Sequence, residues 1–128
     1  MSNIHDQVHN HFKVFAGTYD AQGGLGGLEV AVPAWVAESG AAAKSVGVEY
    51  LESAKRLVLT VGYRTDEPGY AIALKTVNVG RVESLDAAGL ASLEGRMTQA
   101  AAGIANIICH ELFVTETHEV LMVFMTHA

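Results

Sequence analysis

The longest periodic pattern in the chain runs from Ser84 to Ile108 and predicts an α-helix. Ser84 is the predicted N-cap, and the Asp86 carboxylate in the first turn meets the positive end of the helix dipole. The opposite face is small or uncharged, whereas a solvated helix face usually carries Lys and Glu. We therefore expect this helix to be covered on more than one side and to organise the fold. Its apolar residues recur at steps of three and four, which puts them on one side of a helix: Leu90, Leu93, Met97, Ala100, Ile104 and Ile107.

Apolar runs and alternations outside this helix predict strands. Pro33 is expected to open a short helix that ends near Ser45, because proline is preset for a first helical position. Trp35 is the large apolar anchor of that helix, and the glycine-rich residues 21–27 before it are expected to form a loop. The predicted strands cover residues 11–19, 28–32, 47–53, 55–64 and 70–80, with two more inside 109–128.

The last strand has no polar face. Val120 to Met125 are six consecutive apolar residues, so both faces of this strand should be buried. We expect one face to meet the long helix and the other to be covered by a second subunit, since the short helix offers few large apolar groups. The first face carries Val120, Met122 and Phe124, and the second carries Leu121, Val123 and Met125.

The predicted order is β-β-α-β-β-β-α-β-β, with tight hairpins at 65–69 and 115–118. Hairpins imply antiparallel pairing, so we expect an α+β fold in which one long and one short helix pack on a mostly antiparallel sheet. Such a two-layer sandwich is ferredoxin-like or profilin- or roadblock-like in shape, and shape alone assigns no function. Residues 1–128 are expected to form a single domain without an internal repeat. The polar residues 1–10 are expected either to be disordered or to lead into the first strand.

Composition narrows the class of protein. Only 17% of the 128 residues are charged, against roughly 25% in ordinary soluble domains, so part of the surface is expected to be buried in a homo-oligomer. The net charge of −6 without a basic stripe argues against nucleic acid and anionic membranes as partners. Cys109 is the single cysteine, which excludes an intrachain disulfide and any zinc site built on several cysteines.

The start of the chain lacks the pattern of a signal peptide, and no apolar run approaches the ~18 residues of a membrane-spanning helix. These features predict a cytoplasmic protein, and no cofactor is expected.

The histidines near the start of the chain are the candidate metal ligands. His5 and His9 are four residues apart and would share a helix face, with His11 and Asp6 close by. The segment is terminal and polar, so a site there would have to order the chain on binding. A polar chain end without metal is the more common interpretation. The glycines of residues 23–27 match no phosphate-binding spacing, and we interpret them as a connector.

Cys109, His110 and Glu111 are the candidate catalytic residues. Alternation along a strand puts Cys109 and Glu111 on one face and His110 on the other, which is poor geometry for a Cys–His nucleophile pair. A two-residue turn in the following hairpin would place Glu111 opposite Met122 and His110 opposite Val123. A small buried thiol is the favoured interpretation of Cys109.

Arg64, Asn78 and Arg81 are the candidate ligand-binding residues. The two arginines stand near strand ends, and Asn78 interrupts an apolar strand. An anion held by the two guanidinium groups would explain the set, because Arg presents a planar fork of donors. Solvated strand ends are the more common explanation.

These observations predict a small self-associating α+β module that binds a small ligand or a partner protein and has no recognisable catalytic motif. The alternative is a small enzyme with an active site between subunits, in which His110, Glu111, Cys109 or Arg81 performs acid–base chemistry. The sequence leaves the ligand and the substrate open.

Overall fold

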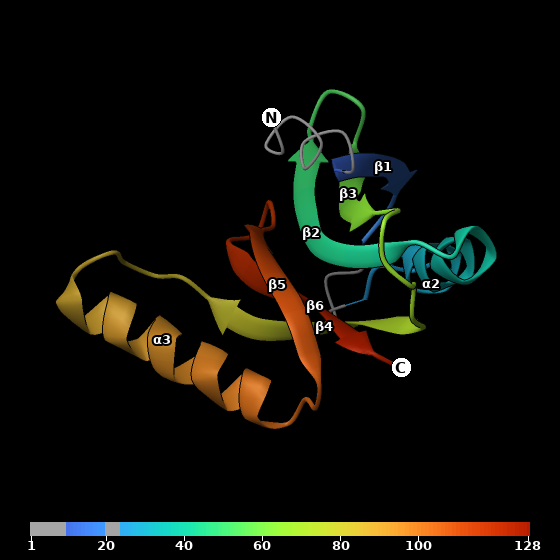
Figure 1. Cartoon of the computed structure of the whole chain (residues 1–128). Coiled ribbons are helices and arrows are strands. Elements are labelled where there is room, and N and C mark those ends of the chain that lie inside the picture. Colours follow the sequence, from blue (N-terminus) through green and yellow to red (C-terminus); the bar gives the residue numbers. More distant parts are fainter. Residues whose placement is uncertain (1–9, 20–23) are drawn as a thin grey trace, which may run out of the picture.

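The computed structural model describes residues 10–19 and 24–128 and shows an α+β fold with antiparallel sheets, one long helix and one short helix (Figure 1). This confirms the predicted fold class. The strands divide between two three-stranded sheets instead of forming one. In chain order the elements are β1 (Asn10–Gly17), α2 (Leu28–Ser39), β2 (Ala42–Leu51), β3 (Arg56–Arg64), β4 (Ile72–Arg81), α3 (Ala87–Ala102), β5 (Ile107–Val114) and β6 (Glu119–His127). The predicted candidates His5 and His9 lie outside the described residues.

The two sheets have the same topology. Sheet 1 has the order β1-β3-β2 and sheet 2 the order β4-β6-β5, with every neighbouring pair antiparallel. The predicted hairpin at 115–118 is confirmed, because the Thr115 N–H donates a hydrogen bond to the Glu119 carbonyl oxygen at 2.8 Å. The predicted hairpin at 65–69 is wrong, because β3 and β4 belong to different sheets. The segment between them connects sheet 1 to sheet 2. That segment passes so close to the end of α2 that a Cβ on Gly69 would lie 2.2 Å from the carbonyl oxygen of Gly40.

The chain consists of two β-α-β-β units with matching features. In each unit the last strand, β3 or β6, pairs with both of the others. Gly40 and Gly103 follow the two helices at an interval of 63 residues. Lys55 and His118, which hold positive φ angles in the two hairpin turns, have the same interval. The repeat is one of structure, because the two halves share few identical residues and the sequence itself shows no repeat.

Helix α2 includes a segment that we predicted as a strand. Leu28, Val32 and Val36 are spaced four residues apart, and all three are buried along one side of the helix. Pro33 lies inside the helix and does not open it. Gly40 ends the helix in the left-handed conformation at φ 70°, so the predicted extension to residue 45 is also wrong. Residues 42–45 belong to β2 instead.

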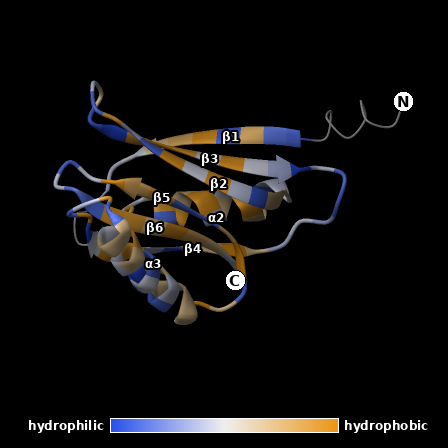
Figure 2. Ribbon diagram, turned by 90° about the vertical axis from the view of Figure 1, so that its left-hand side faces the viewer, coloured by the Kyte–Doolittle hydropathy of each residue, from blue (hydrophilic) through white to orange (hydrophobic). Residues whose placement is uncertain are grey.

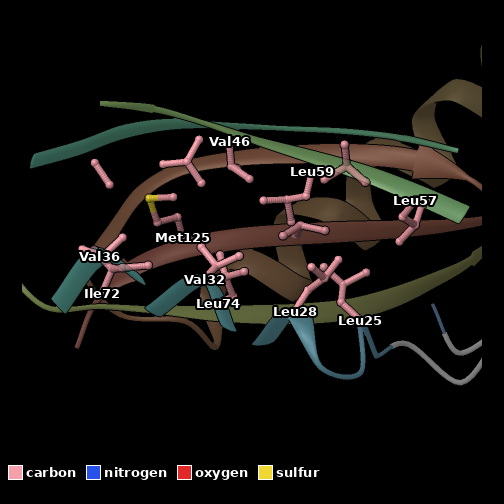
Figure 3. Packing of buried hydrophobic residues seen from close by; sticks show 14 of the residues in the cluster. Leu25, Leu28, Val32, Val36, Val46, Leu57, Leu59, Ile72, Leu74 and Met125 are labelled. Carbon is pink, nitrogen blue, oxygen red and sulfur yellow. The ribbon is translucent and has the colours of Figure 1, made fainter. Parts of the chain in front are cut away.

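The main core lies between the two sheets. Edge strands β2 and β5 lie side by side along one margin of the two sheets. Along the other margin, α2 contacts β1 of sheet 1 and β4 of sheet 2. Figure 2 shows the sheets as two layers with α2 between them and α3 outside. In Figure 3, Leu57 and Leu59 of sheet 1 point toward α2 and β4. The members of this core include Leu25, Leu28, Leu57, Leu59, Phe113, Leu121, Val123 and Met125.

Helix α3 covers the outer face of sheet 2 and has no fully buried residue. Leu93, Met97, Ala100 and Ile104 of the predicted stripe are partly buried there, whereas Leu90 and Ile107 are exposed. The expectation that this helix organises the fold is wrong, because the main core forms around α2. Asp86, and not Ser84, is the N-cap, and its carboxylate accepts a hydrogen bond from the Gly89 N–H at 2.8 Å.

The Arg96 side chain links α3 to the end of β4 through hydrogen bonds. Its guanidinium donates to the carbonyl oxygens of Val79 and Arg81, on either side of Gly80. The bulge in the β4–β6 pairing lies between Asn78 and this glycine, whose φ is 95°. No helix of the described ranges is long and apolar enough to cross a membrane.

Strand β6 is buried on both faces, as predicted for Val120 to Met125. Its Val120, Met122 and Phe124 face meets α3, which is also confirmed. The other face, with Leu121, Val123 and Met125, packs into the main core against α2 and sheet 1. The predicted cover by a second subunit is therefore wrong, because the same chain supplies it.

The two apolar clusters should differ in their contribution to stability. Leu59 is fully buried in the main core, so Leu59→Ala should lower the free energy of unfolding by about 3–5 kcal/mol. Ile104 is only partly buried beside α3, so Ile104→Ala should cost about 1–2 kcal/mol. Denaturant titrations of both variants measure the difference. Equal losses in the free energy of unfolding would mean that side chains in the α3 cluster are as well buried as those in the main core.

Thr76 offers a stabilising substitution. Its hydroxyl is buried and has no hydrogen-bond partner among the described residues. Thr76→Val removes this unsatisfied group at nearly constant volume and should raise the free energy of unfolding by about 1 kcal/mol. Thr115→Val is the matched control: its buried hydroxyl accepts a hydrogen bond from the Glu119 N–H at 3.1 Å, so this variant should lose about 1 kcal/mol. Thermal unfolding of both variants tests the pair, and destabilisation by Thr76→Val would contradict the assignment.

Candidate functional site

A groove in the described part of the chain runs along the boundary between the two sheets. It has a volume of about 510 Å³ and lies over β2 and β3 beside β5. Cys109 of β5 lies next to the Val46 backbone, and Tyr50 of β2 bonds to Glu116 just beyond β5, so the two edge strands run in the same direction. The groove is lined by Gly47, Val48, Glu49, Leu51, Val58, Thr60, Glu111 and Leu112.

Small residues form the floor of this groove. Gly47 and Thr60 are paired across β2 and β3. The Thr60 hydroxyl leans over the glycine so closely that a Cβ there would lie 2.7 Å from its oxygen. Glycine within a strand often marks a place where another group approaches the backbone. The floor therefore carries little side-chain volume, and the apolar side chains of Leu51, Val58 and Leu112 line the groove around it.

Two carboxylates give the groove its charge. Glu49 reaches it from β2 and Glu111 from β5. Glu111 accepts a hydrogen bond from the Leu112 N–H at 3.0 Å. Among the described residues, no lysine or arginine forms an ion pair with either carboxylate. The groove therefore presents an apolar wall beside negative charge that no described lysine or arginine neutralises.

A second groove of about 500 Å³ continues from the first, since Val48, Glu49 and Leu112 line both. It contains two further carboxylates, Glu52 and Glu116. The Tyr50 phenol donates a hydrogen bond to Glu116. This bond, burial of the ring and the nearby negative charges raise the pKa of Tyr50 to about 12. The boundary between the sheets is thus acidic along its length.

Cys109 and His110 do not come together. The register pairs Cys109 with Met125, on the main-core face, and His110 with Phe124, on the α3 face. Burial raises the pKa of the Cys109 thiol. The negative charge of Glu111 adds to this effect, and a hydrogen bond to the Val46 backbone opposes it. A protonated thiol is a poor nucleophile. Cys109 thus has the character of a half-buried structural residue.

The register of this hairpin differs by one residue from the predicted one. Glu111 pairs with Val123, not Met122, and His110 pairs with Phe124, not Val123. Between the paired Thr115 and Glu119 the loop holds three residues and ends at His118, which has a positive φ of 65°. A three-residue loop of this form is a common alternative to the two-residue turn that we assumed.

Arg64, Asn78 and Arg81 do not converge either. Arg64 lies where β3 ends and contacts Asp66 through two nitrogen–oxygen pairs, at 2.8 and 2.6 Å. Arg81 lies at the end of β4 that pairs with Glu119, with its guanidinium 3.7 Å from the Glu83 carboxylate. The Asn78 side chain accepts a hydrogen bond from the Gly80 N–H at 2.8 Å, inside the β4 bulge. Each residue thus has a local structural partner.

His11 is the described member of the histidine group. It lies in β1, with its ring stacked on Tyr63 at a centroid distance of 5.4 Å and its Nε2 3.5 Å from the Thr65 hydroxyl. Within residues 10–19 and 24–128, no three His, Cys, Asp or Glu side chains come close enough to hold a metal ion.

Sequence reasoning found Glu111 and missed Glu49, Gly47 and Thr60. Their strands were predicted, so the alternation that puts these three on one face of sheet 1 was accessible. What no local pattern shows is that β2 and β5, whose groove residues are about sixty positions apart, lie side by side.

The raised pKa of Tyr50 leads to a pH prediction. The unfolded phenol has a pKa near 10, so its contribution to stability is full below about pH 10 and is lost as the pH rises through about 12. Ultraviolet titration should show one tyrosine with a midpoint near 12 in the folded protein. Glu116→Gln removes the charged acceptor and should lower that midpoint. Glu94→Gln on α3 is the control and should leave it unchanged. An unaltered midpoint in Glu116→Gln would contradict the Tyr50–Glu116 bond.

No protein-family pattern matches this sequence, and comparisons with curated proteins and with solved structures give no match. The case for a function therefore rests on the chemistry of the groove.

Proposed function

We propose that this protein is a small-molecule binding module whose ligand lies in the groove between β2 and β5. The observation that carries the proposal is the pair of carboxylates, Glu49 and Glu111, beside the apolar side chains of a groove of about 510 Å³. The matching ligand has an apolar body and a cationic group such as an amine.

Size and polarity support this class of ligand. Small-molecule sites usually measure ~300–1,000 Å³ and combine apolar walls with a few polar groups that orient the ligand. Leu51, Val58 and Leu112 supply the apolar surface, and the Thr60 hydroxyl adds a neutral polar group. The net charge of −6 also favours the approach of a cation. The same acidity argues against nucleic acid as a partner.

The enzyme alternative has less support. A nucleophile needs a base within hydrogen-bond reach, and Cys109 and His110 lie on opposite faces of β5. Arg81 lies beside Glu83, outside the set of groove residues. A binding role needs only the shape and charge that the groove has. The half-buried single cysteine is compatible with a reducing compartment, which supports a cytoplasmic location.

The test uses two probes that differ in charge, phenethylamine and phenethyl alcohol. Amide NMR titrations of the full chain should show shifts at Gly47, Thr60 and Leu112 with the amine. The alcohol should bind at least about fivefold more weakly, because a charge-assisted hydrogen bond is worth roughly 1 kcal/mol or more.

Variants separate the groove from general charge effects. Glu49→Gln/Glu111→Gln should weaken amine binding by about fivefold to tenfold or more. Glu94→Gln, on the exposed side of α3, changes the net charge away from the groove and should have little effect. Equal affinity for the two probes, or unchanged affinity in the double variant, would refute the proposal.

A further inference from the structure

The groove between β2 and β5 and the second groove form one continuous path. Val48, Glu49 and Leu112 line both of them. Because β2 and β5 run in the same direction, the residues of the second groove follow those of the first along both strands. The path therefore leads along the boundary between the sheets to the turns that follow β2 at Leu51 and β5 at Val114.

Aromatic rings line the far end of this path. Tyr50 of β2 and Phe113 of β5 line the second groove, whereas no aromatic residue of the described ranges lines the first. Tyr19 packs edge-on against both rings, with centroid distances of 5.4 Å to Tyr50 and 5.5 Å to Phe113. An ammonium group gains from contact with aromatic rings, because their π-faces carry negative partial charge. This end of the path therefore differs in kind from the Glu49 and Glu111 end.

Two carboxylates lie near the Tyr50 hydroxyl at this end. The hydroxyl donates a hydrogen bond to Glu116, and the negative charge of Glu52 adds to the raised pKa of Tyr50. Both glutamates are exposed, and among the described residues neither forms an ion pair with a lysine or arginine. The second groove thus combines aromatic rings with negative charge, which is the chemistry that recognises an ammonium group.

The spacing of the carboxylates sets the length of a ligand that reaches both ends. Glu49 and Glu52 are three residues apart, so their Cα atoms are separated by at most about 11 Å. Glu111 and Glu116 are five residues apart, which allows at most about 18 Å. An extended octane chain between two nitrogen atoms is about as long as the shorter of these distances, whereas a propane chain is much shorter.

Apolar side chains lie along the path between the two charged ends. Leu51 lines the first groove and Val114 lines the second, and each is 48% exposed. Methylene groups laid on these side chains gain from leaving water. A metal ion has no such apolar surface to offer. The path therefore suits a ligand with an ammonium group at each end and an alkyl chain between them.

We propose that the ligand of this path is a linear aliphatic diamine, with one ammonium group at Glu49 and Glu111 and the other at Glu52 and Glu116 beside Tyr50. This proposal rests on the proposed function of the groove and names the ligand class for that site. One chain that joins two weak contacts raises the affinity, because the second contact forms within the complex that the first has made. A monoamine of equal length makes only one of the two contacts.

Isothermal titration calorimetry of the full chain compares octylamine, diaminooctane and diaminopropane. Diaminooctane should bind at least about tenfold more tightly than octylamine, because its second ammonium group forms a further charge-assisted contact. This gain exceeds the statistical advantage of two equivalent ends. Diaminopropane should bind more weakly than diaminooctane, because it is too short to reach both pairs of carboxylates.

Variants test the contact at the far end. In Glu52→Gln/Glu116→Gln, diaminooctane should keep no more than its statistical advantage over octylamine. Glu52→Gln alone keeps the Tyr50–Glu116 hydrogen bond, so it covers the case in which loss of that bond disturbs folding. It should reduce the advantage of the diamine at least about threefold. Glu94→Gln is the matched control, because Glu94 is an exposed glutamate of α3 outside both grooves, and it should keep the full advantage.

Three results would overturn the diamine proposal. They are equal affinity of octylamine and diaminooctane for the unmodified chain, an advantage of the diamine that survives in Glu52→Gln/Glu116→Gln, and displacement of most of the diaminooctane by an equal concentration of Mg²⁺. The last result would mean that charge alone drives binding. Octylamine that binds as tightly as diaminooctane would leave the groove proposal intact. No binding of either amine would overturn the groove proposal as well.

Discussion

Burial of one apolar core between two sheets is the constraint on which this fold depends. Sheet 1 contributes Leu57 and Leu59, sheet 2 contributes Leu121 and Val123, and α2 contacts strands of both sheets. Each fully buried side chain of this size contributes roughly 1.5–3 kcal/mol. Neither β-α-β-β unit has enough partners of its own to bury these faces. The shared core therefore holds the edge strands β2 and β5 together, and the groove follows from their position.

Much of the local structure was predictable, because it follows from local periodicity. The bounds of β3 and β4 and the buried character of β6 agree with the sequence pattern, since apolar runs report burial directly. Residues 28–32 were mistaken for a strand because five residues fit an alternation and a helix stripe about equally well. The distinction came from Val36 one turn further on, which continues the four-residue spacing of a helix.

The division into two sheets was not predictable from such patterns. Pro68 and Gly69 favour a turn, and a turn between two strands usually joins neighbours in a sheet. Here the turn carries the chain over the end of α2 into the other sheet. The candidate site shares this difficulty. Glu111 was identified as a polar residue on a strand, whereas its association with Glu49 depends on a contact between sheets that only the tertiary fold creates.

The position of β6 has a consequence for synthesis on the ribosome. This strand is central in sheet 2 and buried on both faces, yet it follows the other described elements of the two sheets along the chain. While the earlier elements emerge, Val32 and Val36 of α2 lack part of their cover, and β4 and β5 have no strand between them. The nascent chain must therefore present apolar surface until β6 has left the exit tunnel. Chaperone demand should be highest in that interval, and folding should then be completed in one late cooperative step.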